Sequence, residues 1–158
     1  MSRSSQIAKI LLEKNITLPK PAAPIASYVP YVITGSLIFI SGQGPRQDGQ
    51  LRYTGKVGKD ITMGEGQHAA RLCMLNVLSH LDDACGNSLG KVIRAVRVAG
   101  LVNCDPDFTQ HPQVINGASD LLLEIFGDRG KHARTATGAV SLPANMSVEI
   151  EAVFEIER

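Results

Sequence analysis

Residues 63–84 constrain the fold of this chain most, because they carry a long apolar face at helical spacing. An amphipathic helix must bury such a face against a second layer of secondary structure. β-rich segments precede and follow this helix, so we expect that layer to be a sheet. Gly86 follows the end of the helix, and its apolar face consists of Ala69, Leu72, Cys73, Leu75, Leu78 and Leu81.

The β-rich segments on both sides have different characters. Two short apolar runs flank Thr34-Gly35-Ser36 and predict a hairpin. Residues 91–104 predict a strand inside a sheet, because both of its faces are mostly apolar. On this strand we expect one face to hold Val92, Val96 and Val98 with Arg94, and the other to hold Ile93, Ala95 and Ala99 with Arg97.

The C-terminal part predicts a second helix and two strands. The helix covers residues 112–126, with Pro112 at a permitted early position and Gly127 after its end. The strands cover residues 134–141 and 147–156, and LPAN joins them as a four-residue turn. Such a hairpin places Glu149 opposite Gly138 and on the same face as Arg134. The last strand alternates, with Val148, Ile150, Ala152 and Phe154 on its apolar face.

This order of elements predicts an α+β fold with a mixed β-sheet and two main helices on one face. Residues 4–14 predict an additional N-terminal helix, capped by Ser4 or Ser5, and three prolines after it predict an extended linker. Residues 44–61 predict a loop with a strand near 51–54. We expect one domain over residues 1–158, with residues 1–20 as a helical extension. The second face of the sheet needs a cover, and copies of the chain can provide it.

Composition excludes several classes of function. The net charge is +1 and aromatic residues make up 4%, without tryptophan, so we expect no nucleic-acid partner. No run of about 18 apolar residues is present, so we expect no membrane partner. The three cysteines are an odd number and form no C-x-x-C motif, which favours reduced thiols and a cytoplasmic location.

Motifs for other chemistries are absent from the sequence. The four histidines show neither H-x-x-x-H nor metal-ligand spacing to cysteine, so we expect no metal site. The GQGPRQDG segment lacks the P-loop pattern, and no G-x-S-x-G motif occurs. No cysteine has an adjacent cationic residue that would lower its pKa, and we expect Cys73 to be a core residue.

The segment HARTATGAVSLP, residues 132–143, places one long cation at the start of a strand of small side chains. Read alone, Arg134 has two interpretations. It can be an ordinary solvated charge at a strand end. It can also anchor a carboxylate or phosphate, because the guanidinium fork matches those anions.

Four stretches in the same order resemble the RidA family, also called the YjgF or reactive-intermediate deaminase family. They are ASYVPYVITGSLIFISGQ, DFTQHPQVINGASDLLLEIF, ARTATGAVSLP and VEIEAVFEI, which together cover roughly residues 20 to 157. The N-terminal helix and the GQGPR segment look most like the subgroup labelled YjgF-like or endoribonuclease L-PSP-like. The resemblance implies a chorismate-mutase-like fold and a homotrimer with clefts between subunits.

The resemblance also implies an activity and a site. It implies hydrolysis of enamines and imines, such as 2-aminoacrylate, to 2-keto acids and ammonia without a cofactor. Arg134 matches the arginine that grips the substrate carboxylate, and Glu149 matches the glutamate that positions the attacking water. Ala136 stands where many relatives carry cysteine, and the remaining pocket positions match Tyr28, Ser41, Gly42 and Asn116.

Two other functions stay open at this point. The same cleft can bind a carboxylate metabolite without turnover, in a regulatory or buffering role. Ribonuclease activity is suggested only by a label attached to relatives, and the near-zero net charge speaks against it.

Overall fold

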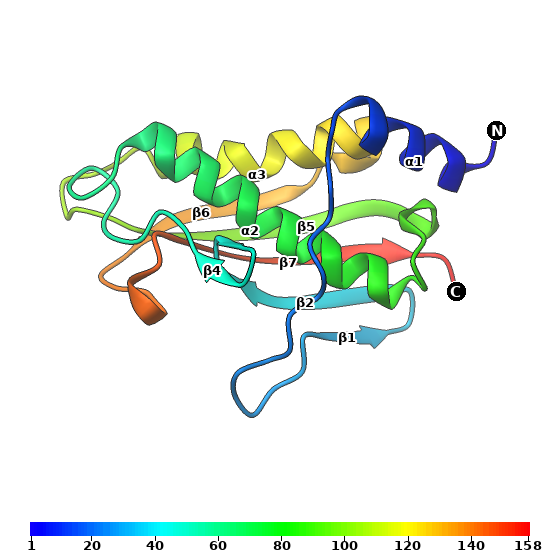
Figure 1. The fold of residues 1–158 in the computed structure, drawn as a ribbon, viewed down its shortest axis with the longest axis horizontal. Coiled ribbons are helices and arrows are strands. Elements are labelled where there is room, and N and C mark those ends of the chain that lie inside the picture. Colours follow the sequence, from blue (N-terminus) through cyan, green and yellow to red (C-terminus); the bar gives the residue numbers. More distant parts are fainter.

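The computed structural model describes residues 1–158 and places helices on one side of a five-stranded sheet (Figure 1). The three α-helices are α1 (Arg3–Glu13), α2 (Met63–Ala84) and α3 (His111–Phe126). The sheet contains β1 (Tyr31–Thr34), β2 (Leu37–Gln43), β5 (Val92–Asn103), β6 (Ala133–Ala139) and β7 (Val148–Ile156). A separate small hairpin consists of β3 (Arg46–Gln47) and β4 (Gln50–Leu51). Short 3-10 helices occupy Leu89–Lys91, Gly127–Gly130 and Pro143–Asn145.

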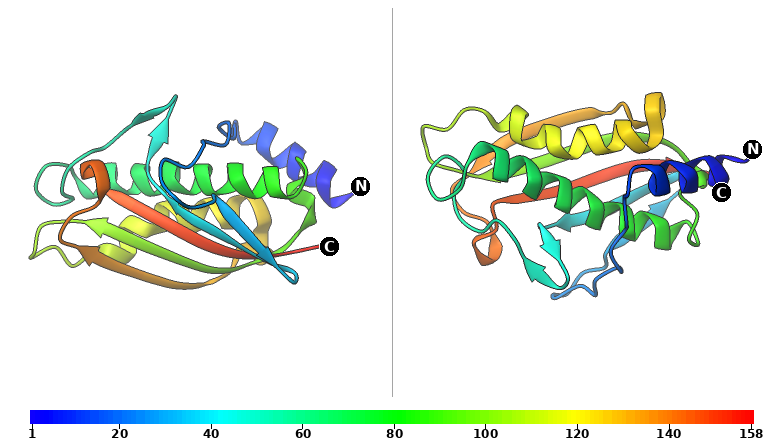
Figure 2. Two further views of the ribbon diagram at one scale, coloured as in Figure 1. Left: turned by 90° about the horizontal axis from the view of Figure 1, so that it is seen from below. Right: turned by 45° about the horizontal axis from the view of Figure 1, so that its top comes forward.

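The sheet is mixed, as the sequence predicted. Its strand order is β1-β2-β7-β5-β6, in which only the pair β5–β6 is parallel. Helix α3 makes the crossover between these two strands, because parallel neighbours cannot be joined by a tight turn. The left view of Figure 2 shows α2 and α3 on the same side of the sheet, so the predicted two-layer arrangement is confirmed.

The predicted hairpin between the last two strands is wrong. Strand β5 lies between β6 and β7 and pairs with both of them. The connection that contains Pro143–Asn145 therefore crosses over β5 to join β6 with β7. Ala144 and Asn145 in this connection both have positive φ. A central place for β7 lets its apolar face be buried beneath the helices, which an edge position would leave partly open.

The predicted faces of β5 are also partly wrong. Its register shifts between Val92 and Arg94, and again between Ala95 and Arg97, where it pairs with β7. Each shift is a β-bulge, which breaks the two-residue alternation of side chains. As a result Val92, Ala95 and Val98 are all buried on one face.

Local sequence explains the helix boundaries. Thr62 and Glu65 form a reciprocal capping box at the start of α2, which satisfies two free backbone N–H groups. Helix α1 begins at Arg3, one residue earlier than predicted, and its N-cap is Ser2 instead of Ser4 or Ser5, because Ser2 accepts the capping hydrogen bond from the Ser5 N–H. At the contact of α2 with α3, a Cβ on Gly117 would lie 2.1 Å from the Gln67 carbonyl oxygen. A glycine is therefore required for these two helices to approach so closely.

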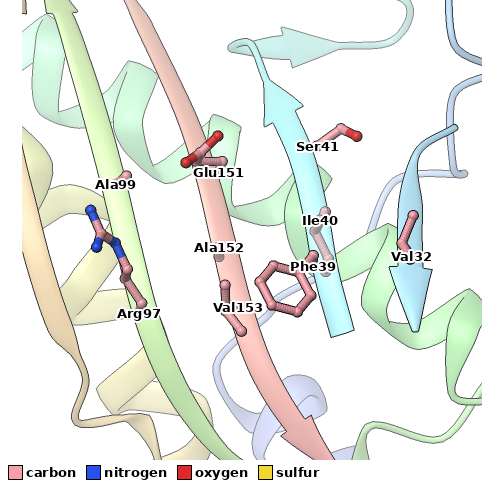
Figure 3. A pocket seen from close by; sticks show the side chains of 9 residues that line it. All are labelled: Val32, Phe39, Ile40, Ser41, Arg97, Ala99, Glu151, Ala152 and Val153. Atoms are coloured by element: carbon pink, nitrogen blue, oxygen red, sulfur yellow. The ribbon is translucent and has the colours of Figure 1, made fainter. Parts of the chain in front are cut away.

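The second face of the sheet is open and partly apolar (Figure 3). Residues paired across the strands form rows on it, such as Val32, Phe39, Val153 and Arg97. Phe39 remains 45% exposed and Val32 remains 54% exposed, although both lie on a sheet face. In Figure 3 Phe39 lies beside Val153 while the helices lie behind the sheet. None of the helices is long and apolar enough to cross a membrane.

Candidate functional site

Arg134 lies on β6 and points toward the first turns of α3. One nitrogen, Nη1, donates to Asn116 Oδ1 at 2.8 Å and to Ser119 Oγ at 3.1 Å, and Nη2 donates to the Pro112 carbonyl at 3.3 Å. The guanidinium is therefore held in one orientation by α3. The structure brings together Arg134 and Asn116, two of the residues that the resemblance selected.

Two residues that sequence reasoning missed support this arrangement. His132 Nδ1 lies 2.6 Å from the Gly130 carbonyl, so Nδ1 carries the proton and donates. In the neutral ring Nε2 is then an acceptor, and Ser119 Oγ lies 2.9 Å from it. Ser119 thus donates to His132 and accepts from Arg134, which fixes both side chains. No motif marks Ser119, because its role depends on α3 lying over β6.

The contacts of Arg134 leave part of its fork available. A guanidinium has five N–H groups, and three of them are used within the chain. The N–H of Nε and one N–H of Nη2 have no partner. Two oxygen atoms of a carboxylate can accept from two such donors. Ala136 follows on the same face of β6 and is partly buried against the core.

A second group of matched residues surrounds a cavity of about 590 Å³ at the other edge of the sheet. Tyr28, Ser41, Gly42 and Glu149 all line this cavity, as does Met146. The cavity adjoins the end of β2 beyond its pairing with β1, where the segment before β1 crosses the sheet edge. Ser41 fixes that segment, since its Oγ donates to the Val29 carbonyl at 2.7 Å.

A bulge in β2 brings Gly42 against Glu149. Between the pairs Ile40–Ala152 and Gln43–Ile150, β2 has two residues where β7 has one. A Cβ on Gly42 would lie 2.4 Å from Glu149 Oε1. Only a glycine therefore lets the carboxyl group lie directly on the backbone of the bulge.

Glu149 is partly buried in this position, and its acidity changes accordingly. Loss of hydration raises its pKa above the ordinary glutamate value, and the negative charge of Glu151 raises it further. A raised pKa brings a carboxylate closer to the range in which it exchanges protons near neutral pH. Glu149 is thus a candidate acid–base group.

The two groups lie on opposite faces of the sheet, which corrects the prediction that Arg134 and Glu149 share a face. Arg134 pairs with buried Val98 and contacts α3, so it is on the helix side. Glu149 pairs with Leu101, which is 39% exposed on the open side. The physical reason is the interposed strand β5, on which these two partners are three residues apart. One chain alone therefore does not bring both groups to one small ligand.

No local sequence pattern indicates a cysteine with basic neighbours, but the fold brings basic side chains close to Cys104. Cys104 Sγ lies 3.4 Å from His111 Nε2, and Lys56 lines the same small cavity. These residues come from three separate segments, so no local pattern could reveal them. No set of three or more His, Cys, Asp or Glu side chains is arranged to hold a metal ion.

Comparison with known proteins places this geometry in a family. The family model described as "YjgF/chorismate mutase-like, putative endoribonuclease" matches residues 8–155. The Protein TCP17 of Trypanosoma cruzi is 43% identical over 154 residues, which cover 97% of this chain and 96% of that protein.

Two solved structures are similar to this structure over nearly the whole chain. Atu1372 of Agrobacterium tumefaciens, a protein of unknown function, is 41% identical with a TM-score of 0.92, covering 98% of this chain and 95% of its own. A Shewanella oneidensis protein described as a putative endoribonuclease is 37% identical with a TM-score of 0.91, and the match covers 95% of this chain and 99% of that one. The predicted chorismate-mutase-like fold is thus confirmed. The chain belongs to the YjgF/chorismate mutase-like family.

Proposed function

We propose that this protein hydrolyses 2-imino acids and their enamine tautomers to 2-keto acids and ammonia. The observation that carries the proposal is Arg134, whose guanidinium is held by three hydrogen bonds and keeps two N–H groups free. A planar 2-imino acid presents a carboxylate that these two donors fit. The chain belongs to the YjgF family, and its resemblance to the reactive-intermediate deaminases of that family supports the same chemistry.

In the proposed mechanism Arg134 binds the carboxylate and fixes the plane of the substrate. Glu149 accepts a proton from water while the water oxygen bonds to C2 and the C=N electrons move to nitrogen. The substrate reacts as its N-protonated iminium form, so this step gives a neutral carbinolamine and a protonated Glu149. Glu149 then returns the proton to the amino nitrogen. The C–N bond breaks, ammonia leaves, and the hydroxyl proton passes to the Glu149 carboxylate as the C=O bond forms. Tyr28, Ser41, Gly42, Asn116 and Ala136 shape the pocket.

The proposal includes a homotrimer in which each site takes residues from two chains. Arg134 and Glu149 lie on opposite faces of one sheet, so a shared ligand requires Arg134 of one chain and Glu149 of another. The open sheet face supports association, because it exposes large apolar side chains such as Val32 and Phe39. Packing of that face against other copies would remove this apolar surface from water.

Turnover is tested with an imine generated in situ by an amino-acid oxidase, in the presence of semicarbazide as a competing trap. Active protein lowers the yield of semicarbazone, which is followed by its absorbance. We expect Arg134→Ala to lose this effect and Arg134→Lys to lose most of it, because lysine lacks the fork. Arg52→Ala is the matched control, since Arg52 is exposed and bonds to no other side chain. An Arg134→Ala protein as fast as the wild type contradicts the proposal.

Shared sites are tested by mixing two inactive variants. Arg134→Ala subunits keep Glu149, and Glu149→Gln subunits keep Arg134. If each site uses both chains, co-expressed variants form some intact sites and regain part of the activity. If both residues act from one chain, every site in the mixture remains defective. Size-exclusion chromatography with light scattering measures the number of subunits.

The same variants separate turnover from binding. Calorimetry with a 2-keto acid measures binding at Arg134 without any reaction. Binding that depends on Arg134 without faster imine hydrolysis than in buffer would indicate a binding protein. Cleavage of a labelled RNA by wild-type protein that disappears on further purification would remove the ribonuclease alternative.

A further inference from the structure

A second cavity, of about 370 Å³, lies beyond the end of β5 and shares no lining residue with the cavity around Glu149. Its chemistry comes from Lys56, Cys104 and His111, and Phe108 forms an apolar wall. The mechanism proposed above uses none of these side chains. They nevertheless form a thiol–imidazole pair, with a cation in the same cavity.

The thiol and the imidazole are placed for proton transfer. Cys104 Sγ lies 3.4 Å from His111 Nε2, within the range of a sulfur hydrogen bond. His111 is fixed by its position at the start of α3 and by an edge-to-face contact with Phe108, with ring centroids 5.6 Å apart. Cys104 is fixed by the bridge of its backbone to Val57.

The backbone of β6 leaves room for this pair. A Cβ on Gly138 would lie 2.7 Å from His111 Nε2 and 3.1 Å from Cys104 Sγ. Any larger residue at this position would therefore force the imidazole or the sulfur to move. The absence of a side chain at Gly138 is a direct condition for the contact.

Lys56 supplies a charge for recognition. Its Nζ donates to Asn103 Oδ1 at 2.8 Å and to the Val140 carbonyl, so one of its three N–H groups has no partner. Asp105 also lines the cavity, and its Oδ1 accepts from the Asp107 N–H. The free N–H of Lys56 can bind one carboxylate oxygen of a small molecule.

The acidity of Cys104 explains why it needs a base. Burial raises the pKa of this thiol, while the charge of Lys56 and the Ala139 N–H lower it and Asp105 raises it. The net direction is upward, so the thiol does not ionise readily without help. His111 can take the proton as the sulfur attacks.

We propose that Cys104, His111 and Lys56 form a reactive site that captures small electrophiles bearing a carboxylate, such as α,β-unsaturated acids. The thiol proton moves to His111 Nε2 and sulfur bonds to the β-carbon. The C=C electrons move to the α-carbon, which takes the proton back from His111. The product is a thioether, and no oxidant or reductant is involved. Lys56 binds the carboxylate and orients the electrophile.

The test uses iodoacetate and iodoacetamide, which differ in charge and both transfer a two-carbon group to sulfur with loss of iodide. Intact mass and peptide mapping follow each thiol over time in the folded protein. Cys73 and Cys85 are internal controls, because both thiols are buried and neither has an imidazole partner. We expect Cys104 to react first and to prefer iodoacetate. Reaction of Cys104 no faster than that of Cys85 overturns the proposal.

Two variants test the assigned roles. We expect His111→Gln to slow alkylation of Cys104 about tenfold or more, as for loss of a general base. We expect Lys56→Met to lower the ratio of iodoacetate to iodoacetamide rates about fivefold, the effect of losing one partly exposed charge. Lys59→Met is the matched control, because Lys59 is exposed and lies outside the cavity. An unchanged rate in His111→Gln, or an unchanged ratio in Lys56→Met, contradicts the site as described.

Discussion

Replacing Gly42 with alanine should displace the carboxyl group of Glu149 while changing the stability of the fold only slightly. The added Cβ would lie 2.4 Å from Glu149 Oε1, whereas ordinary contacts begin near 3.4 Å. The carboxyl oxygen must therefore move by about 1 Å, the difference between these two contact distances. Gly42 does not have positive φ, so its backbone can accept alanine without strain.

The two effects of this change differ in size. The atom that must move is the end of a flexible side chain, so we expect a loss of only about 1 kcal/mol in the free energy of unfolding, the cost of an unfavourable rotamer. Catalysis depends on position more steeply, and a misplacement of about 1 Å can lower the rate about 100-fold. We therefore expect kcat/KM for imine hydrolysis to fall about 100-fold while the protein remains folded.

The assay compares imine hydrolysis in the semicarbazide competition with unfolding in urea. Gly64→Ala is the matched control, because a Cβ there would have no neighbour nearer than 3.9 Å. This control should keep full activity. A Gly42→Ala protein with wild-type kcat/KM would show that the contact between Gly42 and Glu149 does not position the catalytic carboxylate.

Three further changes test other parts of the structure. Ser119→Ala removes one acceptor of Arg134, and we expect KM to rise about tenfold with a smaller change in kcat, as for loss of one hydrogen bond to a charged group. Steady-state kinetics measures both constants, and an unchanged KM would contradict the positioning role. Glu151→Gln removes a negative charge that raises the pKa of Glu149. Since the ionised Glu149 is the base, the acid limb of the kcat/KM profile should move to lower pH, and a shift upward would refute the assignment. Ser147 is fully buried and its Oγ has no hydrogen-bond partner, so Ser147→Ala should raise the free energy of unfolding by about 1 kcal/mol in a urea titration; a clear loss of stability would indicate a missing partner for this hydroxyl.

Helices and strands could be predicted where apolar periodicity or a turn residue within the same segment marks them. The apolar face over residues 63–84 predicted α2 with its observed bounds, and Pro112 marked the start of α3. Gly35 predicted the β1–β2 turn, in which it has a φ of 61°. The alternation of β7 correctly predicted its buried face. In each case the pattern reports on residues close together in the chain, where spacing and turn chemistry decide the outcome.

The candidate site could be predicted only as a set of residues. The matched motifs selected Arg134, Asn116, Gly42 and Glu149, and the structure places these residues in two contacting pairs. Sequence reasoning joined Arg134 and Glu149 on one face, which the structure contradicts. Ser119 went unnoticed, because its contact with Arg134 depends on how α3 lies over β6.

By itself, the sequence determined where the main helices and strands lie, which face of β7 is apolar and which family the motifs resemble. The tertiary structure decided the strand order, the opposite placement of Arg134 and Glu149, and the meeting of Cys104 with His111. The reason is that side-chain periodicity is a local property, whereas a strand has two edges and can pair with any compatible partner. A single bulge or inserted strand then changes which side chains share a face, and no local pattern records that choice.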